Sequence, residues 1–264
     1  MKNILKKNAK IYLAILFAAV LLFGTCGSLG VALAGNLGVE DAGGNDDEII
    51  FGSETKEDGY IGTEMPDSIE GATETDYYIE SVEQFNNFQA ISKTNNFAGI
   101  TVHLAANVSL DENFVGIGST EVPFAGTFDG HGYAITKMSS ANGLFVAVEG
   151  ATIQKLVIGS AKSNTGILAS TANGATVDKI VISRSKVTAA SADTDAVGGM
   201  FGKATGEVTI TNSTVRRLII KTVGETTAVD SFVGYAETTA TMNNCAVVNS
   251  YVNGTFVNCS VLNK

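Results

Sequence analysis

The hydrophobic positions of the chain follow two different spacings, and the change falls near Thr94. Four apolar residues recur at a spacing of three, namely Val82, Phe85, Phe88 and Ile91. This spacing predicts one short amphipathic helix, and Ser81 with Gln84 has the residue types of a capping box at its start. Beyond Thr94, short runs rich in Val, Ile and Thr alternate with Gly, Asn and Asp to the end of the sequence, which predicts strands and turns.

The strand region contains an internal repeat. Four segments begin alike: Gly143-Leu144-Phe145, Gly166-Ile167-Leu168, Gly199-Met200-Phe201 and Ser231-Phe232-Val233, and an apolar strand follows each. Repeats of this length indicate a solenoid or a propeller, and these units hold too few strands for a propeller blade. We therefore predict an all-β parallel β-helix in which each coil stacks about 4.8 Å above the last. Asn212, Asn244 and Asn258 are expected to stack as a polar ladder.

Three consecutive stretches carry a resemblance to a known family: NFAGITVHLAANVSL, PFAGTFDGHGYAITKM and GLFVAVEGATIQKLVIG. They resemble bacterial surface proteins with the Gly-Leu-Phe-Gly type "GLUG" repeat, over about residues 79–264. The resemblance implies a right-handed parallel β-helix that opens with a short helix. Only Gly199, Met200, Phe201 and Gly202 keep both glycines of the repeat. Members of this family are mostly adhesin-like or uncharacterised, so the resemblance speaks more to fold than to function.

Residues 1–34 have the three parts of a secretory signal peptide. A basic start precedes the apolar run Ile11–Phe23, and Ala32-Leu33-Ala34 fits a cleavage site before Gly35. The run is shorter than the roughly 20 apolar residues of a spanning helix, although an uncleaved membrane anchor is the alternative. We predict a bacterial protein that is secreted or held at the cell surface.

The formal net charge of −10 is concentrated just after this segment. Residues 35–78 are acidic and poor in apolar side chains, with Lys56 as their single base, and we predict a disordered spacer there. Residues 79–264, the predicted β-helix domain, are nearly neutral, which argues against a nucleic-acid partner.

Cys26 would leave with the signal peptide, so an exported chain keeps Cys245 and Cys259. Their contexts, NNCAVVNS and VNCSVLNK, are similar, and equivalent places on stacked strands would allow a disulfide. Two small buried side chains are the alternative interpretation.

Few residues suggest chemistry. His103 lies in a predicted strand and His131 in an Asp-Gly turn, with no nucleophile and base placed around either. Asp193 and Asp195 form a carboxylate pair in a loop, too few for Ca²⁺, which takes six to eight oxygen ligands. Four basic residues fall at similar places on two coils and could contact acidic sugars: Arg184, Lys186, Arg216 and Arg217. We predict no catalytic residue, no metal ligand and no cofactor.

The leading hypothesis is therefore a non-catalytic extracellular β-helix, an adhesin-like binding or stalk module for surface glycans or for host and matrix proteins. A polysaccharide lyase or glycosidase on the same scaffold is the first alternative, and it needs carboxylates from successive coils in one groove, about 5–10 Å apart for a glycosidase. A structural fragment of a larger surface protein is the second. The last strand-like segment has no capping helix after it, which favours end-to-end self-association.

Overall fold

The computed structural model describes residues 62–191, 194, 196–223 and 228–262 of the 264-residue chain. The predicted signal peptide and the first part of the predicted spacer lie outside the described residues. The strands are, in chain order, β1 (Thr63–Glu64), β2 (Asp76–Ile79), β3 (Thr101–Leu104), β4 (Val108–Ser109), β5 (Thr127–Asp129), β6 (Ala134–Thr136), β7 (Phe145–Gly159), β8 (Lys162–Ser163), β9 (Ala169–Ser183), β10 (Lys186–Thr188), β11 (Ala196–Gly198), β12 (Phe201–Ala204), β13 (Val208–Thr211), β14 (Thr214–Arg216), β15 (Ile219–Lys221), β16 (Ala228–Asp230), β17 (Val233–Ala236), β18 (Ala240–Asn243), β19 (Cys245–Val252) and β20 (Thr255–Leu262). The predicted all-β class is confirmed, and α2 (Val82–Ile91) is the one helix among the described residues.

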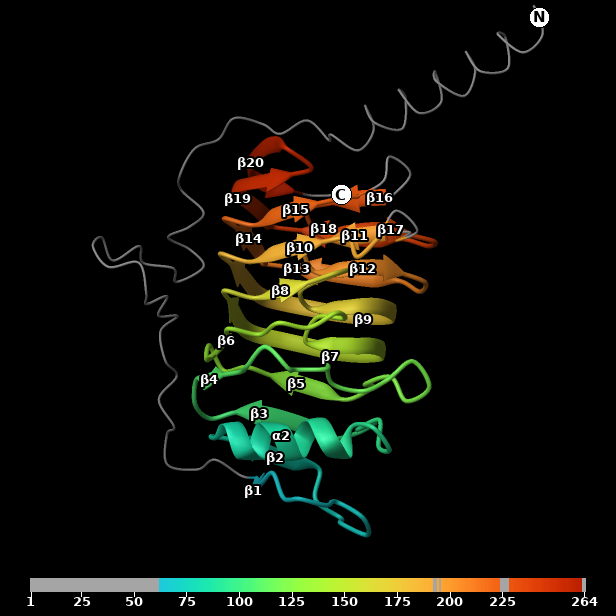
Figure 1. Ribbon diagram of the computed structural model, residues 1–264. Helices are drawn as coiled ribbons and strands as arrows, with labels where there is room; N and C mark the ends of the chain where they lie inside the picture. The colour runs from blue at the N-terminus through green and yellow to red at the C-terminus, as the bar shows by residue number, and fades with distance from the viewer. Residues whose placement is uncertain (1–61, 192–193, 195, 224–227, 263–264) are drawn as a thin grey trace, which may run out of the picture.

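The strands stack in parallel, level upon level. β2 pairs with β3, β3 with β5, β5 with β7 and β7 with β9. Above β9 the same path is divided among β12, β13 and β14, and above these lie β17, β18 and β19. Figure 1 shows this stack rising from β1 to β20, and we call each of its levels a layer. In the described part of the chain every strand pairing except β19–β20 is parallel.

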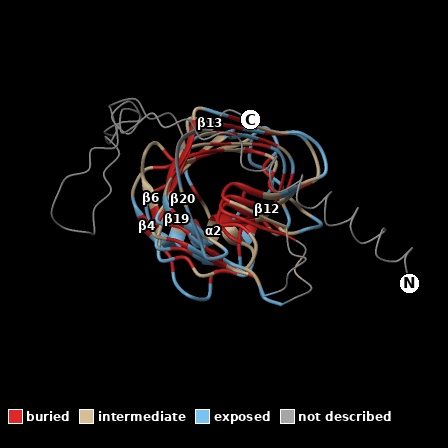
Figure 2. Cartoon of the chain, turned by 90° about the horizontal axis from the view of Figure 1, so that it is seen from above, coloured by how far each residue is buried: buried red, intermediate tan, exposed pale blue. Residues whose placement is uncertain are grey.

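Each upper layer bends at two residues whose backbone is left-handed. The pairs are Lys155 and Ser160, Lys179 and Arg184, Asn212 and Arg217, and Asn244 and Asn249. Seen along the stack, the strands of successive layers lie over one another (Figure 2). The bends therefore recur at the same two places in each of these layers, and the strands between them stay in register.

The core lies inside this stack, and α2 borders its lower end. Phe85 and Phe88 of α2 are fully buried, and the Phe88 ring lies 4.9 Å from that of Phe97 and 5.9 Å from that of Phe128. At the start of α2 the Gln84 N–H donates to the Ser81 hydroxyl, while the Gln84 side chain accepts from the Glu80 N–H. The predicted helix and the cap at Ser81 are confirmed.

Order begins earlier than the boundary predicted at residue 79. β1 pairs with β2, and β2 pairs with β3. Met65 and Tyr77 are buried, with no more than 2% of either residue exposed. These apolar residues are scattered among acidic ones, so average composition conceals them. Residues 62–78 of the predicted spacer therefore belong to the folded region.

The repeated segments lie in adjacent layers, with one shift in register. Phe145 and Phe201 both pair with Ala169, and Phe201 pairs with Val233. The alignment of the repeats predicts Leu168 in this position, and the structure places Ala169 there, so the second repeat carries one extra residue. A Cβ atom at Gly143 would collide with the Gly166 carbonyl oxygen, and one at Gly199 with that of Ser231. The glycines of the repeat therefore allow neighbouring backbones to approach closely.

The predicted asparagine ladder forms in part. The Asn244 side-chain amide donates to Asn212 Oδ1 over 2.8 Å, and that of Asn212 donates to Asp178 Oδ1 over 2.7 Å. Asn258 lies in the antiparallel strand β20, where its side-chain oxygen accepts from the Asn249 N–H. It does not extend the ladder.

The C-terminal strand β20 folds back antiparallel on β19. Cys245 is buried and forms no disulfide with another described cysteine, and the side chain of Cys259 lies outside those described. The disulfide between them stays a prediction. No helix among the described residues is both long and apolar enough to cross a bilayer.

Candidate functional site

One outward face of the stack carries a row of threonines, one in each of six layers. The threonine row consists of Thr101, Thr127, Thr152, Thr176, Thr209 and Thr241. Each pairs directly with the next, so neighbouring side chains lie one strand spacing apart, about 4.8 Å. All six are exposed or partly exposed.

A second row runs beside it, two residues further along each strand. The polar row consists of His103, Asp129, Gln154, Asp178, Thr211 and Asn243. The residue between the two rows points inward in every layer and is buried, as Val102, Phe128 and Ile153 show. The alternation of strand side chains therefore presents two parallel lines of hydrogen-bonding groups on one face.

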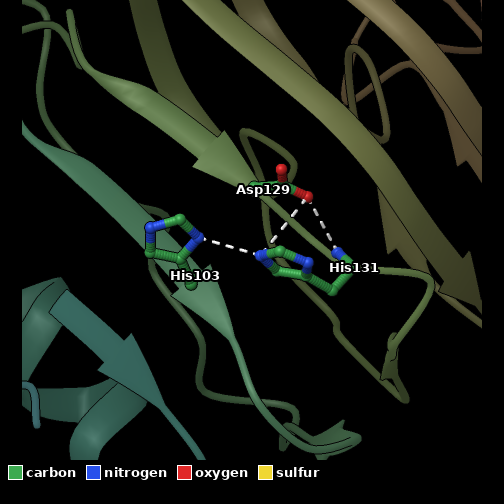
Figure 3. A group of neighbouring side chains, drawn as sticks. All are labelled: His103, Asp129 and His131. Atoms are coloured by element: carbon green, nitrogen blue, oxygen red, sulfur yellow. Dashed lines mark hydrogen bonds and ion pairs between the residues drawn. The ribbon is translucent and has the colours of Figure 1, made fainter. Parts of the chain in front are cut away.

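At the lower end of the polar row, two histidines and an aspartate form a cluster of possible metal ligands. His103 Nδ1 lies 2.9 Å from His131 Nε2, and His131 Nε2 lies 3.8 Å from Asp129 Oδ1 (Figure 3). One ligand atom from each residue lies within 4.8 Å of the other two. The side chains are mostly buried, with 17% of His103, 19% of His131 and 7% of Asp129 exposed.

Neighbouring groups fix the outer atoms of this cluster. Asp76 Oδ1 lies 3.3 Å from His103 Nε2, and Asp129 Oδ2 accepts from the Gln154 side chain over 2.6 Å. Hydrogen bonds from the Thr75 hydroxyl, and next from His103, hold the pKa of Asp76 below its usual value. Lys155 Nζ adds a positive charge 3.7 Å from Asp129 Oδ2.

His131 reaches His103 because its layer carries two extra residues at the bend. Asp129 pairs with Gln154 and Ala134 with Val157, so four residues lie opposite two. His131 has a left-handed backbone, with φ of 47°, and its N–H donates to Asp129 Oδ1 over 3.0 Å. The insertion lets the imidazole turn toward β3, one layer away.

From the sequence alone, His103 is expected in a strand and His131 in a turn, and nothing indicates a contact between them. They are 28 residues apart and no single motif contains both, so the strand register brings them together. The threonine row, by contrast, corresponds to a pattern that can be recognised in the sequence. Six triplets share the order threonine, apolar, polar: Thr101–His103, Thr127–Asp129, Thr152–Gln154, Thr176–Asp178, Thr209–Thr211 and Thr241–Asn243.

The four basic residues singled out in the sequence lie away from the threonine row and the polar row. Arg184 and Arg217 occupy the same bend in adjacent layers, while Arg216 pairs with Ser183. Lys186 pairs with Lys162, beside an open pocket that both lysines line. Asp193 and Asp195 lie outside the described residues.

Comparison with protein-family models, with curated proteins and with solved structures gives no match for this chain. The resemblance to GLUG-repeat surface proteins stays a prediction.

Proposed function

We propose that the folded region is a right-handed parallel β-helix that acts outside the cell as a non-catalytic, adhesin-like binding or stalk module. Its ligand would be an extended polysaccharide lying along the threonine row. The observation that carries this proposal is the unbroken threonine row, with the polar row beside it, over six layers.

The parallel pairing of successive segments supports the coil. Phe145 and Ala169 lie side by side in the parallel strands β7 and β9. The chain between them therefore returns to the same place one layer higher, as one turn of a coil does. Connections between parallel strands of one sheet are right-handed in almost all proteins, which supports the proposed hand. Such a stack is rigid because each layer is hydrogen-bonded to its neighbours.

The chemistry of the two rows supports a sugar polymer. A threonine hydroxyl both donates and accepts hydrogen bonds, as sugar hydroxyls do, and carboxylate and amide groups bind them too. A spacing of about 4.8 Å between layers is comparable to the length of one sugar unit in an extended glycan. Each layer could therefore contact one successive sugar.

The test is a binding screen of the full chain against a panel of neutral and acidic polysaccharides, measured by affinity electrophoresis. We expect retention by at least one extended polymer and no release of reducing ends. Depolymerisation of the bound polymer would contradict the proposal and favour a lyase or glycosidase, and retention by none of the panel would contradict it as well.

Matched variants locate the binding face. Thr176→Val with Thr209→Val removes two exposed hydroxyls of the threonine row while keeping β-branched side chains. Thr188→Val makes the same change in β10, outside the row. We expect the double variant to lose most of the retention and the control to keep it, whereas equal retention of both proteins would show that the ligand lies elsewhere.

A further inference from the structure

We propose that His103, Asp129 and His131 form a binding site for one late first-row divalent metal ion, of the chemical class of Zn²⁺. The site differs from the expectation drawn from the sequence, which included no metal ligand. The site shares His103 and Asp129 with the polar row, but its test is separate from that of glycan binding, because the variants that test glycan binding lie in other layers.

The distances between the ligand atoms suit a tetrahedral ion. Two ligands each about 2.05 Å from a tetrahedral Zn²⁺ ion lie about 3.3 Å apart. The two imidazole nitrogens are 2.9 Å apart, and His131 Nε2 is 3.8 Å from the Asp129 oxygen. Small rotations of the His103 and Asp129 side chains relative to His131 would bring these three ligand atoms around one ion.

The contact with Asp76 sets the required tautomer of His103. A carboxylate accepts a hydrogen bond, so the 3.3 Å contact between Asp76 Oδ1 and His103 Nε2 favours the tautomer that carries its proton on Nε2. Nδ1 then directs a lone pair into the cluster. A carboxylate behind a ligating histidine is the usual arrangement in protein zinc sites.

Asp129 is oriented in a similar way. The Gln154 amide and Lys155 Nζ both approach Oδ2, and Oδ1 is directed at the His131 ring and its backbone N–H (Figure 3). The positive charge of Lys155 opposes a bound cation, so this group should weaken the site without removing a ligand.

The ligand set also indicates which metals bind. Two imidazoles and one carboxylate suit Zn²⁺ and its neighbours in the first transition row, whereas Ca²⁺ and Mg²⁺ prefer oxygen ligands. Three protein ligands leave a fourth position for water or for an outside group. The ion would join β3, β5 and the bend after β5, and so connect two layers near the helical end of the stack.

Zinc titration of the full chain, prepared without a histidine tag, tests the site. We expect one tightly bound Zn²⁺ per chain by calorimetry, with Ca²⁺ and Mg²⁺ unable to displace it. We also expect Co²⁺ to give the visible absorption of a tetrahedral site. Exposed carboxylates elsewhere in the chain would bind ions weakly, and a variant that lacks the cluster measures this background.

Two substitutions remove ligands and suit the local backbone. His131→Asn keeps a residue that tolerates a left-handed backbone, and His103→Thr repeats the residue found at Thr211 in the same row. Both should abolish the tight site and the cobalt spectrum. Asp76→Asn should weaken binding by about tenfold or more, while Lys155→Met should strengthen it.

Thr209→Val is the control, since it lies several layers away and should leave zinc binding unchanged. Circular dichroism of each variant establishes that it is folded. The proposal is overturned if the native chain binds no Zn²⁺ tightly, or if the folded His103→Thr and His131→Asn variants bind it as the native chain does.

Discussion

Small polar side chains complete the bends of the upper layers. Ser213, directly after the left-handed Asn212, accepts from the Ile180 N–H of the neighbouring layer over 3.0 Å and donates to the Thr211 carbonyl. Ser185 and Ser250 make the same pair of bonds at their own bends. At the equivalent place after Asn244, the Cys245 thiol donates to the Asn243 carbonyl.

Ser213→Ala should lower the free energy of unfolding by about 1–3 kcal/mol, because the buried Ile180 N–H loses its acceptor. Urea denaturation followed by circular dichroism measures the change. Thr209→Val, on the exposed side of the same layer, should stay within about 0.5 kcal/mol of the native chain. Equal effects of the two substitutions would contradict this account of the bends.

Burial raises the pKa of the Cys245 thiol, which gives a pH dependence with a defined sign. Above about pH 8.5 the unfolded chain releases this proton while the folded chain retains it, so stability falls as pH rises. The loss is at most about 1.4 kcal/mol per pH unit, up to the folded-state pKa. Cys245→Ser should show a smaller loss in urea denaturation between pH 7 and about pH 10, and parallel curves for the two proteins would contradict the prediction.

At the scale of elements, α2 covers the lower end of the core with two phenylalanines. Phe88 alone contacts the rings of Phe85, Phe97, Phe124 and Phe128. These rings come from the helix, the loop after it and the next layers, so the helix joins parts of the chain that are distant in sequence. Without it, the inward side chains of the first layers would face water.

Phe88→Ala should cost about 3–5 kcal/mol, because it leaves a cavity among these rings. In a stack where each layer contacts mainly its neighbours, the loss should be local. Hydrogen exchange should therefore quicken in β2 and β3 more than in β14. Val82→Ala, at a residue that is 43% exposed, is the control, and uniform loss of protection along the stack would contradict the prediction.

Much of this organisation follows from sequence patterns. The three-residue spacing of apolar residues predicts α2. The repeat predicts parallel layers in which Phe145, Phe201 and Val233 occupy equivalent positions. The extra residue before Ala169 was missed, because the spacing of a degenerate motif does not show which residue pairs across the layers. The histidine cluster was missed for the same reason, since it depends on register and on a two-residue insertion at one bend.

At the scale of the whole molecule, each function proposed above depends on the stacking of layers in register. The threonine row exists only if residues 101, 127, 152, 176, 209 and 241 lie at successive levels on one face. The metal site exists only if β3 and β5 are neighbours. The length of the row should then grow by one strand spacing per layer, whatever the number of residues between layers.

Distances between paired spin labels measure this stacking most directly. Labels replace threonines in a chain whose native cysteines are changed to serine. Thr101 and Thr209 are four strand spacings apart, as are Thr127 and Thr241, so both pairs should give narrow distributions at about 19 Å. Thr101 and Thr241, five spacings apart, should give about 24 Å. Unequal distances for the first two pairs, or broad distributions that do not increase with the number of layers, would contradict the stacked register.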